Sequence, residues 1–186
     1  MAFLTRYLYR AMLWLVLSAS ANAAETLQLH EQEIKAGLLY NFLKYTDWPP
    51  AGMEKSSSIT VCIFGGDPFE GYLEPMAGRT VNQREIALRT IHKIEDAGAC
   101  HLLFVNAGEK ERWPQLLESL QGKPVLTVSD GGGFADAGGA IEFGRKDNHI
   151  SVNLNMEAVM AARLHVQDRL LKLVTVVHPA AREGGR

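Results

Sequence analysis

Short apolar runs alternate along the chain with segments in which apolar residues recur at the spacing of a helix. The runs predict strands, because a strand buried on both faces reads as a continuous hydrophobic stretch. We expect strands at Ile59–Phe64, Arg84–Ile91, Cys100–Val105, Val125–Val128, Ala140–Phe143 and Ile150–Leu154. The helical spacing predicts helices at Glu31–Thr46, Asp67–Met76, Glu109–Leu120 and Met156 to about Val174.

This alternation predicts a three-layer α/β sandwich with a mostly parallel sheet and helices on both faces. The last two strands flank residues 144–148, which are typical of a hairpin, so we expect them to be antiparallel. Arg84–Ile91 alternates only weakly and is expected to be an edge strand. The inner face of the first helix is expected to carry Ile34, Leu38, Phe42 and Tyr45. The apolar side of the last helix is expected to carry Val159, Met160, Leu164, Leu170, Leu171 and Val174.

Two glycine-containing loops follow predicted strands. GGDPF occupies residues 65–69, and SDGGGF occupies residues 129–134. Loops at the carboxyl ends of parallel strands form the crevice where open α/β sheets usually bind ligands. The candidate crevice residues are therefore Asp67, Phe69, Ser129, Asp130 and Phe134.

Neither loop matches a dinucleotide-binding or P-loop motif. Glycine-rich backbone can direct N–H groups at an anion, but without the other motif residues we favour glycines that simply permit tight turns. Asp67 and Asp130 resemble the acidic pocket of a phospho-acceptor domain, yet a helix cap and a turn explain them better.

The sequence shows no catalytic constellation. Ser129 lacks the glycine pattern of a nucleophile elbow. The six histidines are dispersed and show no metal-ligand spacing. We therefore expect no catalytic residues, no cofactor and no metal site.

The first residues predict export. Arg6 and Arg10 precede an apolar run at Ala11–Leu17, and Ala21-Asn22-Ala23 forms a cleavage site. We expect residues 1–23 to be a signal peptide and residues 24–186 to be a single periplasmic α/β domain. Loss of the two arginines reduces the 19 basic residues to 17, against 21 acidic residues, so the formal charge is −4. A mildly acidic chain without a basic cluster argues against nucleic acid as a partner.

Cys62 and Cys100 are the two cysteines of the chain. They lie in predicted neighbouring strands, and export would place them in an oxidising compartment. The residues leave open either a disulfide or two buried thiols.

Five segments, in order, resemble the YfiR-like family of periplasmic proteins: KAGLLYNFLKYTDWP, VCIFGGDPF, ACHLLFVNAGE, GKPVLTVSDGGGFADAGGAIEF and ISVNLN…RLLKL. The resemblance extends from about Ile34 to Leu173. It implies a non-catalytic repressor, expected to be a homodimer, that binds the periplasmic part of an inner-membrane diguanylate cyclase. The resemblance also implies that an outer-membrane, peptidoglycan-associated lipoprotein relieves the repression. Cys62 and Cys100 match the family's cysteine pair, whereas a second pair found in better-known members is missing here.

The last hairpin and helix are the hypothesised partner-binding surface. Its residues are Asn153, Glu157, Arg163 and His165, with Leu164 as an apolar anchor. These residues also suit an ordinary capping hairpin and core helix. The alternative function is a periplasmic small-ligand sensor that uses the crevice between the GGDPF and SDGGGF loops.

Overall fold

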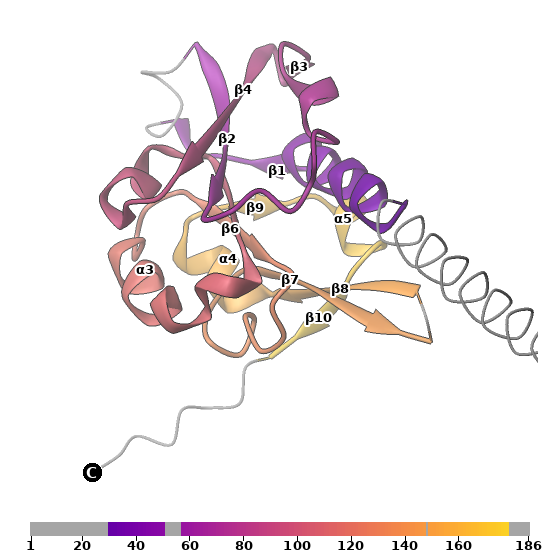
Figure 1. Ribbon diagram of the computed structural model, residues 1–186, viewed down its shortest axis with the longest axis vertical. Coiled ribbons are helices and arrows are strands. Elements are labelled where there is room, and N and C mark those ends of the chain that lie inside the picture. The colour runs from indigo at the N-terminus through magenta and orange to yellow at the C-terminus, as the bar shows by residue number, and fades with distance from the viewer. Residues whose placement is uncertain (1–29, 51–56, 148, 179–186) are drawn as a thin grey trace, which may run out of the picture.

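The computed structural model describes residues 30–50, 57–147 and 149–178. Its larger sheet contains β2 Ser58–Phe64, β3 Thr80–Val81, β4 Arg84–Ile91, β5 Leu102–Val105, β6 Leu126–Ser129, β7 Ile141–Lys146, β8 His149–Asn155 and β10 Thr175–Val177. These eight strands lie in the order β10-β8-β7-β6-β5-β2-β4-β3 (Figure 1). A two-stranded sheet pairs β1 Thr46–Asp47 with β9 His165–Val166.

The middle of the larger sheet is parallel, from β4 through β2, β5 and β6 to β7. The chain passes from β2 to β4 on one side and then continues from β5 outward on the other side. This order is that of a doubly wound sheet with its switch point at β2. The predicted three-layer α/β sandwich with a mostly parallel sheet is therefore confirmed.

The predicted hairpin is confirmed, because β7 and β8 pair antiparallel with Ile141 opposite Leu154. The predicted edge strand and the predicted last strand of the chain both need correction. β4 is not the outermost strand, since β3 pairs with its first two residues. β8 is not the last strand either, because β10 pairs with it in parallel over Asn153–Asn155.

The single helix predicted from Met156 to about Val174 is wrong. This region contains α4 Met156–Ala161, then β9, then α5 Asp168–Leu171. Arg163 has a left-handed φ of 57° and ends the first of these helices. The N–H of Leu164 donates to the carbonyl of Val159 at 3.1 Å, and both side chains lie in one core cluster. This is a Schellman arrangement, in which an apolar contact closes the helix end.

Residues 30–44 are helical, as predicted, but the buried face differs from the predicted one. Leu39, Phe42 and Leu43 are fully buried, whereas the side chain of Ile34 is 42% exposed. The predicted helix also continues too far, because Thr46 belongs to β1. An error of one helical position is enough to rotate a predicted face by about 100°.

Two other predicted helices are not continuous α-helices. After β2 the chain forms turns, of which only η1 Glu74–Met76 is a 3₁₀-helix. The carboxylate Oδ1 of Asp67 nevertheless accepts the N–H of Phe69 at 2.8 Å, so Asp67 caps the first turn. The segment before β6 begins as the 3₁₀-helix η3 Ala107–Arg112 and continues as α3 Trp113–Ser119.

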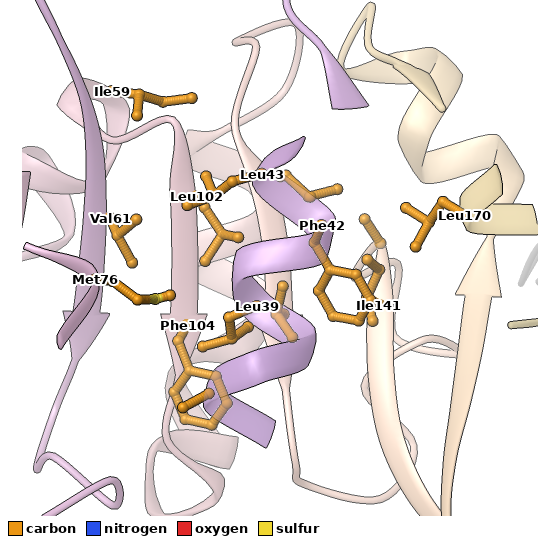
Figure 2. Packing of buried hydrophobic residues seen from close by; sticks show 14 of the residues in the cluster. Leu39, Phe42, Leu43, Ile59, Val61, Met76, Leu102, Phe104, Ile141 and Leu170 are labelled. Carbon is orange, nitrogen blue, oxygen red and sulfur yellow. The ribbon is translucent and has the colours of Figure 1, made fainter. Parts of the chain in front are cut away.

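Side chains on the two faces of the sheet form two separate cores. Val61, Leu102 and Leu126 belong to the first cluster, which the helix at residues 30–44 covers. Figure 2 shows Leu39, Phe42 and Leu43 of this helix packed toward the strands. The next residues along the strands, such as Cys62 and Leu103, belong to the second cluster, which α3 covers. Alternation along buried strands therefore produces the three layers.

The corrected helix face can be tested with two alanine substitutions in one helix. We expect Leu39→Ala to lower the free energy of unfolding by about 2–5 kcal/mol, because it leaves a cavity in the first core cluster. Ile34→Ala is the matched control and should change it by less than about 1 kcal/mol, as for an exposed position. Urea denaturation measures both values, and equal losses would contradict the assigned face.

Candidate functional site

The loop after β6 is shaped by Ser129, one of the predicted crevice residues. Its side chain is fully buried. The hydroxyl Oγ donates to the carbonyl of Val105 at 2.7 Å and accepts the N–H of Gly131 at 3.1 Å. The hydroxyl therefore joins β6 to the neighbouring strand and fixes the start of the glycine turn.

Close packing against aromatic rings explains one of the three consecutive glycines. A Cβ at Gly131 would lie 2.6 Å from the ring of Trp113. That ring packs edge-on against Phe134, with centroids 4.9 Å apart. The side chain of Phe134 is fully buried and belongs to the second core cluster.

The five predicted crevice residues do not come together. Phe69 is fully buried in the first core cluster and packs edge-on against Phe104, whereas Phe134 lies in the second cluster. The two rings are therefore on opposite faces of the sheet. Asp67 caps a turn, and Asp130 forms an ion pair with Lys35 at 3.2 Å.

Asp130 belongs to a charged network that sequence reasoning missed. Lys35, whose side chain is only 7% exposed, also pairs with Glu31 at 3.0 Å. Glu31 in turn pairs with Arg145 of β7. The network thus joins the first helix to the loop after β6 and to the hairpin. Only the Glu31–Lys35 spacing of four residues was visible as a signal in the sequence.

The network alters the ionisation of Glu31, whose pKa lies below its ordinary value of 4.5. Burial by itself raises this pKa. The hydrogen bond and positive charge of Lys35, followed by those of Arg145, outweigh the effect of burial. Glu31 is therefore held in its ionised form.

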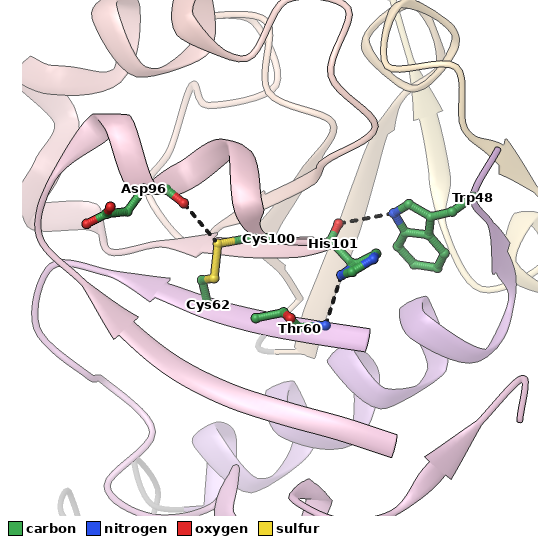
Figure 3. Close-up of a disulfide and its surroundings, with 6 residues drawn as sticks. All are labelled: Trp48, Thr60, Cys62, Asp96, Cys100 and His101. Carbon is green, nitrogen blue, oxygen red and sulfur yellow. Dashed lines mark hydrogen bonds between the residues drawn. A yellow bond between two sulfur atoms is a disulfide. The ribbon is translucent and has the colours of Figure 1, made fainter. Parts of the chain in front are cut away.

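The disulfide left open by the sequence is present between Cys62 and Cys100, with Cα atoms 5.9 Å apart. Cys62 lies in β2, and Cys100 lies two residues before the start of β5 (Figure 3). The next residue, His101, accepts the N–H of Thr60 through Nδ1 at 2.9 Å, and its carbonyl accepts the indole N–H of Trp48 at 3.3 Å. The bond therefore links two central strands where a buried polar network also joins them.

The hypothesised partner-binding residues lie on three successive elements. Asn153 is half-buried in β8, while Glu157 of α4, Arg163 and His165 of β9 are exposed. Leu164 is only 6% exposed, so its predicted role as a surface anchor needs correction. The apolar group that the surface does offer is Met160, which was placed on the apolar side of the predicted last helix and is 62% exposed.

A small pocket of about 130 Å³ lies between β4 and the turns that follow β2. It includes Asp67 but none of the other four predicted crevice residues. In residues 30–50, 57–147 and 149–178, no group of three or more His, Cys, Asp or Glu side chains is placed to hold a metal ion. No helix within those ranges is long and apolar enough to cross a bilayer.

Reduction of the disulfide tests its contribution to stability. The bond closes a loop with a sequence separation of 38 residues. For a loop of this length, a disulfide stabilises the folded state by about 4 kcal/mol, because it restricts the unfolded chain. We therefore expect reductant to lower the urea midpoint of the parent protein. The Cys62→Ala/Cys100→Ala variant is the control, and its urea midpoint should be the same with and without reductant. A parent midpoint that reductant leaves unchanged would contradict the prediction.

Acidification tests the charged network. Because the folded-state pKa of Glu31 is lowered, its contribution to stability is present above pH 4.5 and is lost as pH falls through the folded-state value. We expect the free energy of unfolding to decrease with acidification in this range, and Glu31→Gln to make the decrease smaller. Glu33→Gln, an exposed position on the same helix, is the control. Identical pH profiles for both variants would rule out this role of Glu31.

Comparison with known proteins identifies one family. A family model described as YfiR/HmsC-like matches residues 32–175. This range contains both cysteines, the glycine loop, the charged network from Lys35 onward and the pocket beside β4. The match covers more than half of the chain and agrees with the resemblance of its five sequence segments. The chain therefore belongs to the YfiR/HmsC-like family.

Proposed function

We propose that this protein is a periplasmic negative regulator that binds the periplasmic part of an inner-membrane diguanylate cyclase and lowers cyclic di-GMP synthesis. Family membership carries the proposal, because it suggests a periplasmic regulator of diguanylate cyclase signalling. Release by an outer-membrane, peptidoglycan-associated lipoprotein and a homodimeric state are parts of the same proposal.

Two features of the fold support a regulatory binding role. The Cys62–Cys100 disulfide suits the oxidising compartment in which such a regulator would work. The polar groups around the glycine loop hold the structure together, since Ser129 bonds to neighbouring main chain and Asp130 pairs with Lys35. Binding through the surface of the molecule makes no demand on these groups.

The proposed contact surface comprises Asn153, Glu157, Met160, Arg163 and His165. It differs from the sequence-based hypothesis in one respect, because exposed Met160 replaces buried Leu164 as the apolar contact. A flexible methionine side chain suits a contact surface, since it adapts to irregular partners. Glu157 and Arg163 lie near opposite ends of α4 and flank Met160 with opposite charges.

The small-ligand sensor stays a prediction as the second function. Its five crevice residues are divided between two faces of the sheet, and no specific feature of the described residues favours it. Thermal stabilisation by a member of a small-molecule library would test it, because a ligand stabilises the folded state by mass action.

Cellular cyclic di-GMP tests the regulatory proposal. We expect deletion of the gene to raise the cyclic di-GMP level. The exported chain should return the level to that of the parent strain, and a chain lacking residues 1–23 should not. Met160→Gln/Arg163→Gly should fail to restore it fully, because it removes two contact groups while glycine preserves the left-handed turn. Ile34→Gln, at another exposed apolar position, is the control and should restore it.

The outcomes separate the function from the surface. An unchanged cyclic di-GMP level on deletion would overturn the proposed regulation. Full restoration by Met160→Gln/Arg163→Gly, at equal protein abundance, would instead overturn only the proposed contact surface.

A further inference from the structure

Other segments that the structure describes cover only the first part of the outer edge of β4. At the start of the strand, Ile86 donates its N–H to Arg79 at 2.9 Å and accepts the N–H of Gly78 at 3.0 Å. Every second residue of a strand directs its main-chain groups to the same edge, so those of Leu88 and Thr90 also face outward. Among the described residues, no main-chain hydrogen bond reaches either of them from this edge.

The pocket of about 130 Å³ lies next to these open main-chain groups. Strand register places Leu88 beside Val61 and Thr90 beside Ile63. These residues share the pocket with Leu73, which gives it a largely apolar wall. The pocket and the open strand edge therefore form one continuous feature.

Two carboxylates give the pocket a negative charge. Asp67 and Glu74 both line it, and neither forms an ion pair with another described residue. Asp67 uses one oxygen to cap Phe69, which leaves the other for a ligand. Arg89 also borders the pocket, but it lies opposite Cys62, whose side chain belongs to the second core. Strand alternation therefore directs the guanidinium to the other face of the sheet.

We propose that the edge of β4 binds an extended peptide segment of another protein, with a lysine or arginine side chain in the adjoining pocket. The peptide adds a strand by bonding to the main chain of Leu88 and Thr90, and the pocket selects its side chain. The aliphatic stem of the basic residue packs on Val61, Ile63 and Leu73. Its charged end reaches Asp67 and Glu74, where charge-assisted hydrogen bonds fix it. This site is separate from the proposed cyclase contact and does not depend on it.

The test uses the end-blocked peptide Thr-Val-Lys-Val-Thr at millimolar concentration, with amide NMR shifts of the labelled protein as the readout. We expect shifts at Leu88, Thr90 and Gly71. Replacement of lysine by glutamate in the peptide should weaken binding roughly tenfold or more, because a charge-assisted contact is lost. N-methylation of the peptide backbone should also weaken binding, because it blocks strand addition.

Protein variants test the same contacts. Asp67→Asn/Glu74→Gln should weaken binding of the lysine peptide roughly tenfold, while asparagine retains the oxygen that caps the turn. Glu70→Gln/Glu95→Gln removes the same charge from exposed positions outside the pocket and should leave binding unchanged.

Three results would overturn the proposal: no shift at Leu88 and Thr90, equal binding of the lysine and glutamate peptides, or shifts that map away from β4. If free n-butylamine shifts the same residues as strongly as the peptide does, the pocket binds small amines and strand addition is wrong.

Discussion

The central strands β2, β5 and β6 bury apolar side chains on both faces, so neither face of the sheet can be left to solvent. The first helix must cover one face and α3 the other.

Each buried aliphatic or aromatic side chain contributes about 1.5–3 kcal/mol. Two such side chains together exceed the cost of about 1–2 kcal/mol for the left-handed conformation of Arg163. Burial of Leu164 and Val159 therefore holds that turn in place without a glycine.

The central strands could be located well from the sequence, because a short continuous apolar run is typical of a strand buried on both faces. The prediction for the region after Met156 failed for an equally physical reason. Val159, Leu164 and Leu170 enter the same core from α4, the turn after it and α5, so their spacing imitates one face of a single helix. Arg163 gives no warning of the break, since glycine is the usual residue at such a position. The three residues of β10 are too few to show a period.

The candidate sites were less predictable than the fold, because they depend on contacts between distant segments. Glycine is needed at position 131 because the ring of Trp113, from another element, leaves no room for a Cβ. The local sequence around Gly131 does not show this. Lys35 and Asp130 were each visible in the sequence, but their pairing depends on where the first helix packs. The pocket beside β4 depends on the register of β2 and β4, which fixes the side chains that share a face.

The ion pair between Lys35 and Asp130 joins residues 95 positions apart. The ring of Phe42 packs against Phe143, which is still further along the chain. Contacts between distant residues form late, since chain entropy opposes them until most of the structure exists. Synthesis completes the helix at residues 30–44 well before β6 and β7. The apolar face of this helix therefore stays unburied until those strands are present. The helix at residues 30–44 is thus among the last of the described elements to reach its final packing.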